Sequence, residues 1–122
     1  MHKILSLLFF AASTLNVWAA DQSWVKVSEP GDLAYWVTVG KPLPSKNPDE
    51  VIYQTRRDFP DFFKVEKARL NCITGQKQVL SSDQYATDKG NLIDHVDFTK
   101  HERPLVYMLT PSQKEFKVAC RS

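Results

Sequence analysis

The sequence has few cysteines and glycines, and it lacks the short motifs on which several enzyme classes depend. It contains two cysteines and four glycines among 122 residues. The glycines are isolated from one another, so no glycine-rich loop is present to cradle a phosphate group. No G-x-S-x-G nucleophile motif and no Asn-x-Ser/Thr glycosylation acceptor occur. These absences give no support to a phosphate-binding or nucleophilic enzyme, and we predict a protein without enzymatic activity or cofactor.

The chain also lacks a strong net charge and a long apolar run. Sixteen basic residues against 14 acidic residues give a formal charge of +2 at pH 7. A nearly neutral chain has no global field to attract nucleic acid, so we do not expect that class of partner. A transmembrane helix needs about 20 consecutive apolar residues, and no segment reaches that length.

The first twenty residues have the pattern of a cleaved export signal. Met1, His2 and Lys3 form a short basic start, and an apolar stretch of about a dozen residues follows at 4–15. Small residues then occupy the places where a signal peptidase cuts, with the preferred cut just before Ala20 and a second just after it. We therefore predict a signal peptide over residues 1–20 and a single exported domain over 21–122, located in the periplasm or secreted.

Cys72 and Cys120 both lie in the predicted exported domain. An even number of cysteines in an oxidising compartment is normally paired, so we predict a structural disulfide. A redox pair or a pair of metal ligands is the alternative. It is less favoured because the two residues do not form a C-x-x-C motif and no histidine lies near either in the sequence.

Alternating apolar and polar residues predict an antiparallel sheet. The clearest example is 51–59, where Val51, Tyr53 and Thr55 share one face. Within 63–72 the alternation of apolar residues shifts by one position near Glu66 or Lys67, which indicates a bulge or a break between two strands. Three prolines within 40–49 predict an exposed connector rather than a member of the sheet. The candidate strand segments are 24–27, 33–39, 51–59, the two parts of 63–72, a returning strand that begins at 77–80, an edge strand at 92–98 and a buried strand at 105–109.

The C-terminal segment has the strongest helix signal. Thr110 followed by a proline, with Gln113 three residues on, forms a capping box. Phe116, Ala119 and Cys120 then share one face at helical spacing, so a Cys72–Cys120 bond would hold this helix on the sheet. The predicted fold class is α+β, with a sheet of about five to six strands and one C-terminal helix.

Two groups of residues are candidates for a binding or metal site. One is a local concentration of basic residues, which would suit an acidic protein surface, a polyanion or a lipid headgroup unless it is only a solvated sheet face; its members are Arg56, Arg57, Lys64, Lys67 and Arg69. The other comprises Asp94, His95, Asp97 and His101, which would have to converge through a loop to bind metal. We therefore predict surface polar residues there, and no metal.

Several short motifs, taken in order, resemble the surface-adhesin protein E family of small exported proteins of Gram-negative bacteria. The motifs are Trp24-Val25-Lys26-Val27, Tyr35-Trp36, Arg69-Leu70-Asn71-Cys72, Tyr85 followed by Gly90, Leu109-Thr110-Pro111-Ser112 and the closing Cys120. The resemblance implies an antiparallel sheet of about six strands, a C-terminal helix, a Cys72–Cys120 disulfide, binding of host matrix or plasma proteins, and possible dimerisation. No lipobox cysteine follows the leader, so we expect no lipid anchor.

The residues and the resemblance together predict a non-enzymatic exported binding module with a protein partner. The alternative is a periplasmic accessory subunit that stabilises a larger envelope assembly. A hydrolase using His95 or His101 is a third possibility, and it has no nucleophile motif to support it.

Overall fold

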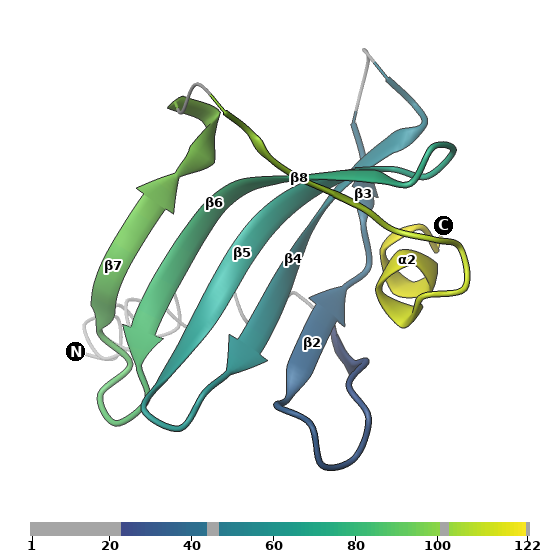
Figure 1. Ribbon diagram of the computed structural model, residues 1–122. Coiled ribbons are helices and arrows are strands. Elements are labelled where there is room, and N and C mark those ends of the chain that lie inside the picture. The colour runs from purple at the N-terminus through teal and green to yellow at the C-terminus, as the bar shows by residue number, and fades with distance from the viewer. Residues whose placement is uncertain (1–22, 44–46, 101–102, 122) are drawn as a thin grey trace, which may run out of the picture.

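A computed structural model describes residues 23–43, 47–100 and 103–121, so the predicted signal peptide lies outside the described part. The described chain is mostly antiparallel sheet, and all strand pairings are antiparallel (Figure 1). The strands are β1 (Trp24–Lys26), β2 (Tyr35–Thr38), β3 (Lys41–Pro42), β4 (Glu50–Asp58), β5 (Phe62–Asn71), β6 (Gln76–Ala86), β7 (Leu92–Asp97) and β8 (Leu105–Met108).

The long strands β4, β5 and β6 form the centre of the sheet, whose order is β1-β2-β4-β5-β6-β7. β3 pairs with β4 beyond the end of β2, and β7 and β8 follow one another along the same edge of β6. A short 3-10 helix (Phe98–Lys100) follows β7. β8 then leads the chain across one end of the sheet to the helix α2 (Lys114–Ala119), as Figure 1 shows.

Helix α2 packs on one face of β2 and β4, and this contact forms the core. The strand period of two sends alternate side chains of β4 to this face, which explains the alternating burial of the strand. The core residues are Val37, Val51, Tyr53, Ala68, Leu70, Phe116, Val118 and Ala119. The same face extends beyond the end of α2, where the site described below lies.

The predicted disulfide is present. Cys72, just after β5, is bonded to Cys120, the residue that ends α2. The Cα atoms of the two residues lie 5.9 Å apart, and the bond closes a loop with a sequence separation of 48. Since α2 has only six residues, it depends on tertiary contacts and this covalent link for its position.

Three details of the sheet differ from the prediction. Within the described ranges the sheet has eight strands, more than the predicted number of about five to six. One of the extra strands is β3 within the predicted proline-rich connector: Lys41 and Pro42 are exposed and pair with β4, because an outer strand tolerates a proline. The register shift lies beside Lys67, as expected, but the extra residue is Leu80 in the neighbouring strand β6.

The end of the chain differs in two further ways. The predicted buried strand is β8, and its side chains are mostly exposed because it pairs only with β6. The helix begins at Lys114, later than the capping box predicts. The Gln113 side chain nevertheless accepts a hydrogen bond from the Thr110 backbone N–H at 2.6 Å, so half of the predicted box forms within the preceding turn.

Candidate functional site

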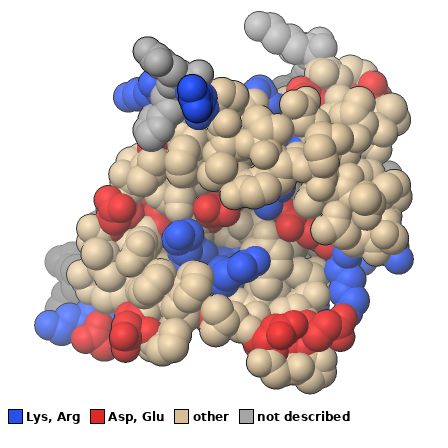
Figure 2. Space-filling model, in the orientation of Figure 1, with Lys and Arg blue, Asp and Glu red and all other residues tan. Residues whose placement is uncertain are grey.

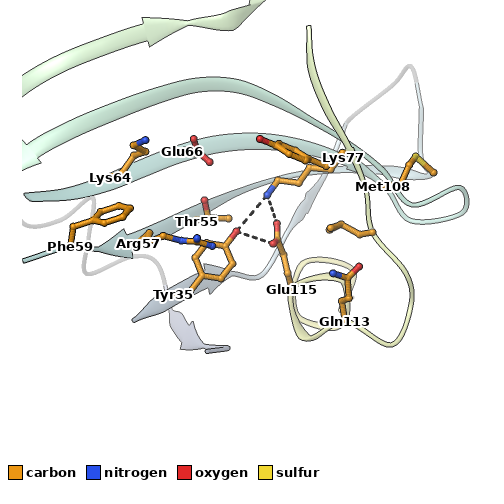
Figure 3. A pocket seen from close by; sticks show the side chains of 12 residues that line it. Tyr35, Thr55, Arg57, Phe59, Lys64, Glu66, Lys77, Met108, Gln113 and Glu115 are labelled. Carbon is orange, nitrogen blue, oxygen red and sulfur yellow. Dashed lines mark hydrogen bonds and ion pairs between the residues drawn. The ribbon is translucent and has the colours of Figure 1, made fainter. Parts of the chain in front are cut away.

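A cleft of about 470 Å³ opens on the face of the sheet that carries α2. Figure 2 shows this face, with basic atoms gathered near its middle and acidic atoms beside them. Six elements or their flanks contribute to the cleft, so its walls come from distant parts of the sequence (Figure 3). The lining residues are Tyr35, Thr55, Arg57, Phe59, Lys64, Glu66, Lys77, Tyr107, Met108, Leu109, Gln113 and Glu115.

A buried polar network centred on Glu115 of α2 lies within the cleft, between Arg57 on one side and Met108 on the other (Figure 3). Lys77 Nζ of β6 lies 2.6 Å from Glu115 Oε2, and the two side chains are only 7% and 11% exposed. The Tyr53 hydroxyl donates to the same Oε2 at 2.6 Å, and the Tyr35 hydroxyl donates to Oε1 at 2.8 Å. The Glu115 carboxylate therefore links α2 to β2, β4 and β6 at once.

This network is a fixed structural element in which each polar group has a partner. Burying a charge is costly unless it is paired and hydrogen-bonded, and Lys77 and Glu115 satisfy that condition through each other and the two tyrosines. Burial, followed by the negative charge of Glu115, raises the pKa of Tyr35 and of Tyr53 far above the ordinary value. Both hydroxyls therefore remain protonated donors at any physiological pH.

Two cations line the cleft beyond this network. Arg57 of β4 and Lys64 of β5 are directly opposite each other in the sheet register. The guanidinium of Arg57 lies over the ring of Tyr35, with its central carbon 4.4 Å from the ring centroid. Among the described residues, neither cation forms an ion pair with an acidic side chain, and Glu66 in the same cleft is likewise unpaired.

The predicted basic cluster is divided between the two faces of the sheet. Arg57 and Lys64 line the cleft, whereas Arg56, Lys67 and Arg69 belong to the opposite face, because the side chains of a strand alternate. On that face Arg56 pairs with Asp58 at 2.7 Å. Arg69 donates to Gln78 at 2.7 Å. The structure thus brings together two of the five residues as lining of one cleft.

The opposite face carries several aromatic side chains beside Arg56. The rings of Phe63 and Tyr85 stack with centroids 5.1 Å apart, and the Arg56 guanidinium lies 4.0 Å from the centroid of Phe63. Trp36 donates its indole N–H to Asp58 at 3.3 Å. These contacts give Arg56 both an aromatic and an acidic neighbour on this face.

Three of the residues considered as metal ligands, Asp94, His95 and Asp97, lie in the edge strand β7. His95 is hydrogen-bonded to Asp83 of β6, a contact that raises the pKa of the imidazole. Asp97 accepts hydrogen bonds from Thr99, which lower the pKa of its carboxyl group. His101 lies outside the described residues. Within the described ranges, no three histidine, cysteine or acidic side chains are grouped to hold a metal ion.

A second hollow of about 480 Å³ lies beside β3. Its lining is largely apolar and includes Pro42, Leu43 and Ile52. Lys41 is the charged residue among those that line it. It has no counterpart to the paired network or to the two adjacent cations. The cleft between the sheet and α2 is therefore the better candidate for a specific site.

The predicted site residues did not include Lys77, Glu115 or Tyr35, although Tyr35 belongs to one of the motifs of the family resemblance. For Lys77 the sequence does hold an indication. Lys77 and Val79 are two residues apart in one strand and so share a face, which predicts that the Lys77 side chain points to the core. A signal for Glu115 also exists, because it lies three and four residues before Val118 and Ala119, which are buried on the same side of the helix. Neither signal identifies the partner, because 38 residues separate Lys77 from Glu115.

Fold and site together define a small antiparallel β-domain with one disulfide-linked helix and a polar cleft on the helix-bearing face. Protein-family models, curated proteins and solved structures contain no significant match to this chain. Among the described residues, no helix combines the length and apolar content needed to cross a membrane.

Proposed function

We propose that this chain is a non-enzymatic, exported binding module that presents the cleft face of its sheet to a protein partner. The observation that carries the proposal is the pairing pattern inside the cleft. Lys77 and Glu115 neutralise each other in a buried network, whereas Arg57 and Lys64 face the cleft without an acidic partner among the described residues. A fixed wall beside two free cations is suited to binding an anionic group.

The chemistry of the cleft favours binding over catalysis. Of the two carboxylates in the cleft, Glu115 already accepts from Lys77, Tyr53 and Tyr35, so Glu66 is the one that could accept a proton as a general base. The raised pKa of the two tyrosines makes them poor nucleophiles and poor bases at neutral pH. The described lining of the cleft includes no histidine, cysteine or serine.

The export signal and the sequence motifs support the compartment and the partner class. A basic start, a short apolar run and small residues before Ala20 are typical of a leader that is removed during export. The motifs that resemble the surface-adhesin protein E family support a partner among host matrix proteins or envelope macromolecules. The disulfide is consistent with an oxidising compartment.

The test is direct binding of the exported protein to immobilised extracellular-matrix proteins, measured by biolayer interferometry. The protein is expressed with its own leader and purified from the envelope or the medium, and mass spectrometry checks for loss of about twenty N-terminal residues. We expect saturable binding at micromolar concentration or below. Failure to bind any matrix protein, together with stable co-purification with an envelope complex, would instead support the accessory-subunit alternative. An intact leader on the native protein would contradict export.

A further inference from the structure

The geometry points to Arg57 and Lys64 as an anchor for one carboxylate, supplied by an aspartate or glutamate side chain of the protein partner. This inference deepens the proposed function and rests on it. Neither cation belongs to the Lys77–Glu115 network, and both line the same cleft. Figure 3 shows their side chains beyond the network, on adjacent strands.

The register of the sheet explains why an anion would stabilise Arg57 and Lys64. Side chains directly opposite each other in antiparallel strands have Cβ atoms about 4.5–5.5 Å apart, and like charges at that spacing repel. Arg57 and Lys64 occupy such positions and have no acidic partner among the described residues. A carboxylate bound between them removes the repulsion and gains charge-assisted hydrogen bonds from both sides.

The two cations have different roles in the anchor. The guanidinium of Arg57 is placed by its contact with the Tyr35 ring, so its planar group of donors is partly oriented before a ligand arrives. Lys64 is half-buried and contributes a point charge on a flexible stem. Arginine therefore determines the orientation of the carboxylate, and lysine adds attraction.

The charges around the cleft favour a single carboxylate over a polyanion. Lys77 and Glu115 cancel each other, which leaves Arg57 and Lys64 against the one carboxylate of Glu66. A densely charged polymer such as a nucleic acid would bring further phosphates towards Glu66 and be repelled. The apolar ring of Phe59 lies beside Arg57 and Lys64 in the same cleft (Figure 3), which favours an acidic residue with an apolar neighbour.

The test uses two capped peptides and isothermal titration calorimetry at low salt. One probe is acetyl-Gly-Leu-Glu-Leu-Gly-amide, and its control carries glutamine in place of glutamate. Inorganic phosphate is a third ligand. The protein variants are Arg57→Gln, Arg57→Lys and Lys64→Gln. The matched control is Lys67→Gln, which removes the same charge from an exposed lysine on the opposite face of the same strand.

We expect the glutamate peptide to bind at least about tenfold more tightly than the glutamine peptide, since hydrogen bonds to charged groups are the stronger class. Arg57→Gln should weaken binding by about tenfold or more, and Arg57→Lys should recover only part of it because the planar fork is lost. Lys64→Gln should weaken binding by about three- to tenfold. Lys67→Gln should change it by less than about twofold, because its charge is outside the cleft.

Three results of the peptide and phosphate titrations would overturn the anchor. They are equal binding of the two peptides, an equal loss of binding in Lys67→Gln and Lys64→Gln, and saturable phosphate binding without peptide binding. Each variant is first compared with the wild type by circular dichroism and thermal unfolding, so a loss of folding is recognised. If a matrix protein binds the wild type and Arg57→Gln equally well, the anchor is wrong and the proposed function stands. If no macromolecule binds but the peptide does, the proposed function fails and the carboxylate site stands.

Discussion

Replacing Glu115 by glutamine should reduce the free energy of unfolding by about 3–5 kcal/mol, the cost of removing one partner from a buried ion pair. Glu115 accepts hydrogen bonds from Lys77 Nζ at 2.6 Å, Tyr53 at 2.6 Å and Tyr35 at 2.8 Å. Glutamine has nearly the same size, but it leaves the Lys77 ammonium, only 7% exposed, without a counter-charge. The glutamine side chain also ends in an NH2 group, which is a donor and would face the donor groups of Lys77, Tyr53 and Tyr35.

The measurement is urea unfolding with the disulfide intact, in which the midpoint and slope give the free energy of unfolding. The double variant Lys77→Met/Glu115→Gln should be more stable than Glu115→Gln alone, because it removes the unpaired buried charge. Glu29→Gln is the matched control. Glu29 forms an equally simple ion pair with Lys114 at 2.8 Å, but both side chains are more than half exposed, so no measurable loss is expected. A loss below about 1 kcal/mol for Glu115→Gln would refute the reasoning.

Three further predictions concern stability. Replacing both cysteines by alanine should lower the free energy of unfolding by about 4 kcal/mol, because the unfolded chain is no longer constrained by a closed loop with a sequence separation of 48. Urea titration measures this loss, and an unchanged unfolding midpoint would contradict it. The Asp83 hydrogen bond raises the folded-state pKa of His95, so its stabilisation is fully present below about pH 6.5 and disappears as the pH rises through the raised value. The wild type should therefore exceed His95→Gln in unfolding midpoint by more at pH 5.5 than at pH 8.5; an equal difference at both values would count against the pair. Gly40→Ala should lower the free energy of unfolding by about 1–3 kcal/mol, because the added Cβ would lie 2.3 Å from the Ala119 carbonyl oxygen. Thermal unfolding measures the loss, and an unchanged stability would show that α2 can move away.

The parts of the fold that follow from local periodicity could be predicted. The alternation of Val51, Tyr53 and Thr55 predicted the buried face of β4, because each strand residue turns to the opposite side from its neighbour. The spacing of Phe116 and Ala119 predicted which side of α2 is buried, for the equivalent helical reason. Both patterns are local, so one sequence is enough to recognise them.

The errors arose where pairing decides the structure. Pro42 suggested a connector, but an outer strand of two residues does not need every backbone donor. The apolar stretch of β8 suggested burial, but its position along one edge of β6 leaves Val106, Tyr107 and Met108 exposed. Local composition does not reveal which strands lie at an edge.

In the candidate site, too, some features follow from the local sequence and others depend on long-range pairing. The concentration of basic residues was visible in the sequence, and the strand period alone separates neighbouring Arg56 and Arg57 onto opposite faces. The pairing of Arg57 with Lys64 depends on the β4–β5 register. The Lys77–Glu115 contact depends on how α2 crosses the sheet, and no local pattern encodes it. Long-range charge pairs of this kind require the three-dimensional structure.

The most direct test of the carboxylate anchor is nuclear magnetic resonance of the arginine and lysine side-chain nitrogens during titration with the glutamate peptide. We predict saturable shifts of the Arg57 guanidinium and the Lys64 ammonium, with Lys67 and Arg69 unchanged on the opposite face. Saturable shifts confined to Lys67 and Arg69, or no saturable shift at Arg57, would contradict it.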